Sequence, residues 1–170
     1  MGNLSEAYRY RELYEAATQN VPMSRRGHPN RTFDNILKVA TAMLHREIKY
    51  RVGNFTAEFR YLRSAIKRDD SLLYTEPWEW TVPTRHAFAT LSLEQGHVEA
   101  AARAYAEDLG VAKRLTLAHQ RPECVWALHG YHECLARLGQ DKAIIKHQLN
   151  VAVAVAEVEI RSSCFVGWEP

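Results

Sequence analysis

Three glycines spaced 43 residues apart constrain the fold of this 170-residue chain more than any other feature. Gly53, Gly96 and Gly139 each lie between two stretches with apolar residues at helical spacing, in the segments YRVGNF, LEQGHV and ARLGQD. A fixed interval in this range is typical of repeat proteins, in which each helical unit buries its apolar face against its neighbours. The spacing therefore predicts an all-α chain built from repeated helix–turn–helix units.

The central unit, Pro83 to Leu109, is the most regular of the three. Ala101 follows Gly96 by five residues and Tyr105 follows it by nine. A helix–Gly–helix unit with Ala and Tyr at these offsets resembles the tetratricopeptide repeat. That repeat usually has a period of about 34 residues, so about nine further residues would lie in the loop between repeats, most clearly in the segment YTEPWEW.

The resemblance extends over most of residues 36–165. The segments EIKYR, PTRHA, LEQG and VWALHGYHECLARLG are similar to the C-terminal region of larger tetratricopeptide-repeat (TPR) proteins. The resemblance implies an all-α, TPR-like helical-repeat solenoid of antiparallel helix pairs, with about seven helices. In these proteins the first helix of each pair lines a concave surface.

We expect a single TPR-like domain over residues 1–170. Its predicted parts are a half-repeat or capping helix at 1–20, helix pairs at 33–68, 83–113 and 122–160, and a tail at 161–170. For the last helix two signals conflict. The segment VAVAVAEVEI alternates as a strand would, whereas the repeat requires a helix there, and we predict a helix.

The first helix lacks a partner, with Gly2 standing where the turn glycine of a pair would be. Two explanations stay open: the chain is the C-terminal piece of a longer protein, or this helix caps the stack with its polar face. The incomplete repeat could equally form a homodimer surface.

Composition narrows the classes of function. The net charge is +2, without the clustered basic stripe that nucleic-acid binding needs. An apolar run of about 18 residues and an N-terminal signal are both missing, so we expect no membrane partner. Three cysteines, an odd number without a CxxC pair, are typical of reduced thiols, and the sequence predicts a cytoplasmic protein. It contains no P-loop, dinucleotide fingerprint or GxSxG motif.

Polar and aromatic side chains gather on one predicted stripe. The positions ten, six and three residues before each turn glycine share a face of the first helix, because residues at i, i+4 and i+7 lie together. If the first helices line a concave groove, this groove contains Glu47, Tyr50, His86, Trp126, His129 and Glu133.

Three interpretations of this stripe compete. The favoured one is a groove for a partner peptide or protein, in which Glu and His donate or accept hydrogen bonds and Tyr and Trp anchor the ligand. The second is a small-molecule or metal-dependent enzyme: His86, His129 and Glu133 are the catalytic candidates, and together with Glu47 they are the candidate ligands of a divalent metal. The third is a structural network in which these groups satisfy one another.

The connector before the central unit carries a possible lid over the groove, made of Trp78, Trp80 and Arg85. Packing is the favoured role of the two tryptophans, since Trp is usually largely buried. Arg85 could pair with a nearby glutamate (Glu76, Glu79 or Glu123) or contact a carboxylate of the ligand.

The segment HGYHEC looks like a metal-binding motif but does not have the geometry of one. His132 and Cys134 are two residues apart, on different faces of a helix. His132 falls at a helix–helix contact position, which predicts a histidine satisfied within the core. Cys134 is predicted to be a small buried apolar group.

Overall fold

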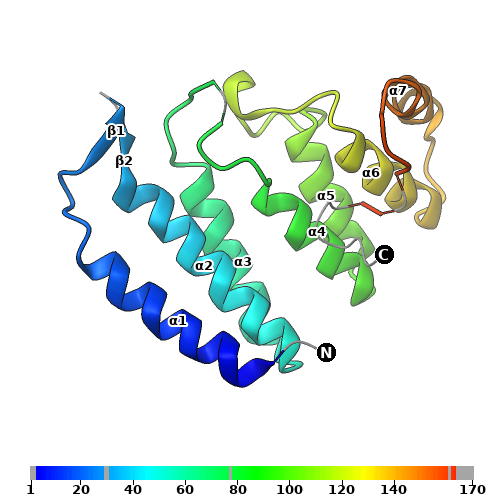
Figure 1. Cartoon of the computed structure of the whole chain (residues 1–170). Helices are drawn as coiled ribbons and strands as arrows, with labels where there is room; N and C mark the ends of the chain where they lie inside the picture. The colour runs from blue at the N-terminus through cyan, green and yellow to red at the C-terminus, as the bar shows by residue number, and fades with distance from the viewer. Residues whose placement is uncertain (1–2, 29–30, 77, 161, 164–170) are drawn as a thin grey trace. The chain divides into compact units, whose positions relative to one another are not determined.

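The all-α prediction is confirmed by the computed structural model, which describes residues 3–28, 31–76, 78–160 and 162–163 (Figure 1). These residues form seven α-helices and one short antiparallel hairpin. No helix among them combines the length and the apolar character needed to cross a bilayer. The predicted turn role of Gly2 and nearly all of the predicted tail at 161–170 lie outside the described residues.

The helices of each pair are joined by short turns, whereas longer connectors lead from α3 to α4 and from α5 to α6. They are α1 (Leu4–Gln19), β1 (Arg26–His28), β2 (Arg31–Thr32), α2 (Phe33–Arg51), α3 (Phe55–Asp69), α4 (Thr84–Glu94), α5 (Val98–Asp108), α6 (Val125–Arg137) and α7 (Ala143–Ala154). A 3-10 turn at Leu117–His119 lies between α5 and α6. The chain divides into two units, residues 1–84 and 85–170. Each unit is described below by itself.

The three glycines form the same bend. Their φ angles are 70°, 78° and 65°, in the left-handed region that glycine adopts without strain. After each glycine, a backbone N–H reaches back five residues: Asn54 to the carbonyl of Lys49, His97 to that of Ser92, and Gln140 to that of Leu135. This is the Schellman ending of a helix, and it satisfies carbonyls that the helix itself leaves unpaired.

The helices that follow these bends do not all start alike. α3 and α5 begin two residues after their glycines, whereas α7 begins four residues after Gly139. Glu58 and Ala101, five residues after the first two glycines, are fully buried. The corresponding Ile144 is 75% exposed, and its neighbour Ile145 is buried instead. The later start of α7 thus moves its inward face by one residue.

The strand-like alternation VAVAVAEVEI is helical only in part. α7 continues through Ala154, and residues 155–160 leave the helix. The prediction of a helix over this segment is therefore correct for its first half, and the predicted end near residue 159 is about five residues too late.

Unit 1 is organised around the antiparallel pair of α2 and α3, with α1 packed along α2 (Figure 1). The hydroxyl of Tyr14 donates to the carbonyl of Leu37 at 3.1 Å, and His45 Nε2 lies 2.7 Å from Glu15 Oε1. These two contacts, from adjacent residues, hold the C-terminal half of α1 against α2. The core between α2 and α3 contains Val39, Ala42, Ile48, Leu62 and Ala65.

The connector from α3 to α4 is held to unit 1 rather than free. Asp69, buried at the end of α3, accepts a hydrogen bond from the hydroxyl of Thr84 at 2.9 Å. Leu72 is buried as well. The apolar character of residues 69–82 is therefore explained in part by packing.

Unit 2 has a core in which small residues allow close helix packing. Ala101, Ala102 and Ala104 of α5 are buried together with Tyr105. Tyr105 requires Gly130 on α6, since a Cβ at that position would lie 2.4 Å from its Cζ atom. The core also contains Ala89, Leu93, Leu109, Ala127, Leu128, Cys134, Leu135 and Ile145.

Candidate functional site

The predicted groove residues divide between the two units. Glu47 and Tyr50 belong to α2 in unit 1, where both are half-buried. The Glu47 carboxylate pairs with Arg51 at 2.9 Å and with Arg46 at 3.2 Å. The Tyr50 ring packs against Phe55, with ring centroids 6.1 Å apart. These contacts place both side chains in interactions within unit 1.

His86 lies inside unit 2, facing α5. It is 2% exposed, and its Nε2 atom is 2.9 Å from Oδ2 of Asp108, which is fully buried. Its ring also packs against Tyr105, with centroids 6.0 Å apart. The stripe rule placed His86 on an open surface, whereas the structure buries it between helices.

The remaining three groove residues share one face of α6. Trp126, His129 and Glu133 are all half-buried, as their spacing within one helix predicts. Glu133 pairs with Arg137 one turn further on. His129 Nδ1 is buried, and no hydrogen-bond partner is found for it in the described part of the chain.

The predicted lid residues also divide between the units. Trp78, in unit 1, is exposed, and Trp80 is half-buried with a buried indole N–H. Arg85, in unit 2, is buried, and its Nε donates to Glu107 at 3.3 Å. Arg85 thus pairs with Glu107, which is not among the glutamates predicted for it.

A network of charged groups lies at the end of α5, where Glu107 and Asp108 are buried and Arg114 is exposed. Glu107 accepts hydrogen bonds from Arg85 and from Arg114, the latter at 3.0 Å. Asp108 accepts from Arg121, with Nη1 2.8 Å from Oδ1, and is paired with His86. The carboxylates are therefore neutralised where they lie, as buried charges must be.

Cys124 joins this network at the N-terminus of α6. One ligand atom from each of His86, Asp108 and Cys124 lies within 4.8 Å of the other two, which makes a set of three potential metal ligands. Burial raises the pKa of the Cys124 thiol, while the backbone N–H groups of Ala127 and Trp126 act in the opposite direction. Sequence reasoning missed Asp108 and Cys124. The signal for Asp108 was the pair Arg85-His86 at the start of one helix and Glu107-Asp108 at the end of its antiparallel partner, and Cys124 had no comparable signal.

His132 and Cys134 of the HGYHEC segment lie in different environments. Cys134 is fully buried, and burial raises its pKa to about 12, which keeps the thiol neutral. The prediction of a small buried apolar group is confirmed for it. His132 is only half-buried, and no hydrogen-bond partner is found for its buried Nε2 among the described residues, so the prediction of a satisfied core histidine is wrong. Burial lowers the pKa of His132, and Lys142 and Lys146 act in the same direction.

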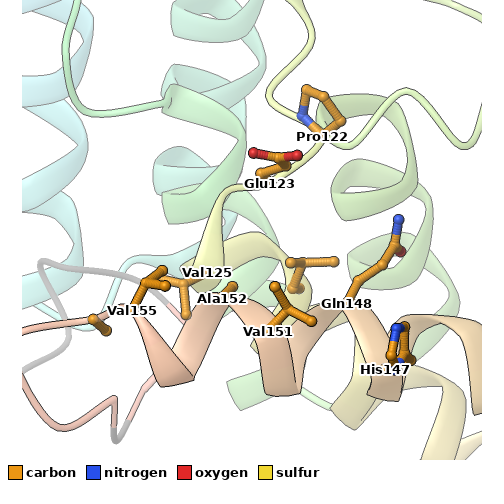
Figure 2. A pocket seen from close by; sticks show the side chains of 10 residues that line it. Pro122, Glu123, Val125, His147, Gln148, Val151, Ala152 and Val155 are labelled. Atoms are coloured by element: carbon orange, nitrogen blue, oxygen red, sulfur yellow. The ribbon is translucent and has the colours of Figure 1, made fainter.

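An apolar pocket of about 550 Å³ lies between α7 and the start of α6 (Figure 2). α7 contributes its residues in two parallel rows spaced by four, and Val125 and Leu128 of α6 form the floor. Glu123 and Pro122 lie across from the valines of α7 in Figure 2. The residues from α7 and its end are His147, Gln148, Val151, Ala152, Val155 and Ala156.

The apolar side chains of α7 are unusually exposed around this pocket. Val151 is 56% exposed, and Val155, which directly follows α7 and also lines the pocket, is more exposed still. In α7 only Ile145 is fully buried. A run of exposed apolar side chains beside a pocket is typical of a surface that binds another protein.

Comparison with protein-family models, curated proteins and solved structures finds no match to this chain.

Proposed function

We propose that this chain is a TPR-like interaction module and that unit 2 binds an amphipathic helix of a partner protein in the pocket between α6 and α7. The observation that carries the proposal is the open apolar pocket flanked by exposed Val151 and Val155. A helix-in-groove complex of this kind depends on apolar side chains at i, i+3, i+4 and i+7 of the ligand.

The repeat architecture is supported by the three equivalent glycine bends. Stacked helix pairs with the same bend between their two helices are the unit from which solenoids are built. The TPR resemblance adds the expectation that such a stack is used for binding.

A helix is the occupant that best fits the surface. The α7 residues lining the pocket form two rows spaced by four residues, and ridges of this kind accept the side-chain rows of another helix. Within unit 2 the α5 helix is covered in this way, because α6 packs along it. A ligand helix on α7 would repeat that arrangement.

The rim of the pocket indicates the charge of the ligand. Glu123 is exposed and lies at the edge of the otherwise apolar lining. We therefore expect the bound helix to place a Lys or Arg beside its apolar face, since complementary rim charges speed association and fix register. The predicted ligand is a helix with leucine-like anchors and one flanking basic residue.

Binding is favoured over catalysis by the polar groups of the predicted groove, most of which are engaged with protein partners. His86 is bonded to Asp108, Glu47 to Arg51, and Glu133 to Arg137. A small-molecule or metal-dependent enzyme built on His86, His129 and Glu133 would have to break two of these pairs. The pocket between α6 and α7 needs no such rearrangement.

The proposal is tested with a panel of synthetic amphipathic helical peptides, each with leucines on one face and either Lys or Glu flanking them. Binding is measured by fluorescence anisotropy on the wild-type protein and on Val151→Asp. We expect at least one Lys-flanked peptide to bind and the Val151→Asp variant to weaken it at least about tenfold, because a carboxylate in an apolar pocket is costly to desolvate.

Val111→Asp is the matched control. Val111 is 54% exposed, almost the same as Val151, but it lies outside the pocket. Equal weakening in both variants, or no binding of any peptide, would contradict the proposal. Concentration-dependent dimerisation of the wild type that Val151→Asp abolishes would also contradict it, because the occupant would then be a second copy of this chain.

A further inference from the structure

Three side chains of different chemistry meet where α4, α5 and α6 come together in unit 2. His86 lies in the first turn of α4, Asp108 is the last residue of α5, and Cys124 is the N-cap of α6. Their ligand atoms all lie within 4.8 Å of one another. An imidazole nitrogen, a carboxylate oxygen and a thiol sulfur are the three donor types that zinc sites in proteins use.

The cluster is built into the core and not spread over a surface. Asp108 is fully buried, His86 is 2% exposed, and Cys124 is half-buried. Cys124 is the least buried of the three residues. Exposed groups of acidic residues are common and carry little meaning, whereas a buried mixed set of this kind is unusual.

The orientation of Asp108 is fixed by a neighbour that is not itself a ligand. Arg121 donates from Nη1 to Oδ1 at 2.8 Å, and its backbone N–H donates to the Asp108 carbonyl at 2.7 Å. The other carboxylate oxygen, Oδ2, is left facing His86. Hydrogen bonds of this kind orient metal-binding carboxylates in known sites.

We propose that His86, Asp108 and Cys124 bind one zinc-class transition metal ion. Zn²⁺ forms bonds of about 2.0–2.2 Å to nitrogen and oxygen and about 2.3 Å to sulfur, so neighbouring ligand atoms in a tetrahedral shell are about 3.3–3.6 Å apart. The 2.9 Å separation of His86 and Asp108 is close to this value, and the sulfur need approach by only about 1 Å. A water molecule would complete the shell.

Proton balance on binding is simple. The Cys124 S–H bond breaks, its proton leaves to solvent, and the sulfur bonds the metal as a thiolate. His86 binds through Nε2, whose proton, held against Asp108 Oδ2 in the metal-free protein, leaves to solvent, while Nδ1 carries the proton of the metal-bound neutral imidazole. The N–H groups in the first turn of α6, which favour the thiolate of Cys124, assist this step.

The donor set also predicts which ions bind. A thiolate and an imidazole select Zn²⁺ and Co²⁺, while Mg²⁺ and Ca²⁺ prefer shells made of oxygen. A bound ion would link three helices of unit 2 and the connector between α5 and α6. It would therefore raise the unfolding temperature of the chain, by an amount that grows with the logarithm of the metal concentration divided by its Kd.

The test uses the full chain without an affinity tag. Co²⁺ is titrated into the reduced, metal-free protein, and the sulfur-to-cobalt charge-transfer absorption in the near ultraviolet is recorded together with the unfolding temperature in excess Zn²⁺. We expect one equivalent of Co²⁺ to saturate the charge-transfer band and Zn²⁺ to raise the unfolding temperature.

Cys124→Ser and Cys134→Ser form a matched pair of variants. Cys124→Ser should abolish the charge-transfer band and lower the affinity at least about tenfold, while Cys134→Ser, which removes a buried thiol outside the cluster, should retain both. Near-ultraviolet circular dichroism of the metal-free variants checks that each one folds. A band that persists in Cys124→Ser, or no band in the wild type, overturns the proposal. In that case His86, Asp108 and Arg121 form a structural network only.

This site does not depend on the proposed partner helix, because the pocket between α6 and α7 contains none of the three ligands. Loss of metal binding and loss of peptide binding can therefore be told apart in the same preparations.

Discussion

α5 and α7 occupy the same place in consecutive helix pairs, and they differ in what covers them. Each follows a turn glycine, and they contain 11 and 12 residues. Seven residues of α5 are buried, from Ala101 to Asp108, whereas in α7 only Ile145 is. α6 packs along α5, and no described helix packs along the outer face of α7. Within unit 2, the second helix of a pair is thus largely buried where a further helix packs along it and largely exposed where no described helix does.

The largest difference in unfolding free energy between matched variants of α5 and α7 is expected at the central inward position of each helix. Tyr105 is fully buried and its hydroxyl donates to the carbonyl of Ser163, while Leu149, which takes the corresponding place in α7, is half-buried. We expect Tyr105→Ala to cost about 3–5 kcal/mol of unfolding free energy and Leu149→Ala about 1–2 kcal/mol. Urea denaturation of both variants measures this, and equal costs would contradict the comparison.

The second-largest loss of stability is expected where α5 and α6 lie in close contact. A methyl group at Gly130 would lie 2.4 Å from Cζ of Tyr105 and 2.7 Å from Cβ of Ser163, so Gly130→Ala should cost about 1–3 kcal/mol by overpacking. Combining it with Tyr105→Leu, which removes the clashing ring atoms, should recover part of that cost. An additive double variant would show that the contact with Tyr105 is not the cause.

Replacing the glycine should cost the same stability at the bend before α5 as at the bend before α7. Gly96 and Gly139 both have positive φ, and a Cβ at either position would meet no atom within 4 Å. Gly96→Ala and Gly139→Ala should therefore each cost about 1–2 kcal/mol through backbone strain alone. Thermal unfolding of the two variants measures this. A much larger loss at Gly96 would show that the bends are not equivalent in energy.

The smallest expected effect is a pH dependence at the contact of α6 with α7. Burial lowers the pKa of His132, and the charges of Lys142, Lys146 and His129 lower it further. As pH falls through about 6.5, the unfolded chain takes up a proton that folded His132 does not, so stability is lost on acidification. The loss between pH 7.5 and 5.5 should be smaller in His132→Gln.

His147→Gln is the control for that measurement, since His147 is exposed on α7. It should leave the pH dependence of unfolding as it is in the wild type. If both variants flatten the dependence equally, the effect does not come from burial of His132.

Helix positions were predictable from the sequence because they depend on local signals. The turn glycines and the apolar spacing predicted six paired helices, and six are observed in the described part of the chain, but the predicted ends of the last two pairs lie about five residues beyond the ends of α5 and α7. The inward face of α7 was not predictable in the same way. It depends on where the helix starts after Gly139, and the two added residues there move the buried position from Ile144 to Ile145.

The candidate site was harder to predict, because its residues meet only through tertiary packing. The helical period shows that Trp126, His129 and Glu133 share a face, but it does not show which face of a helix meets a neighbour. His86 is buried because Asp108, 22 residues later, lies opposite it at the far end of an antiparallel pair. Cys124 comes from a third helix, and no spacing within a single helix relates it to the other two.

The glycine bends also bear on how a chain like this can change over time. Each bend needs one left-handed residue and has open space around its α-carbon, so it works equally well ahead of a covered helix and an uncovered one. Duplication or deletion of a whole 43-residue segment would therefore leave every remaining connection intact. Each remaining unit would keep the helix ending that its own glycine and hydrogen bonds provide.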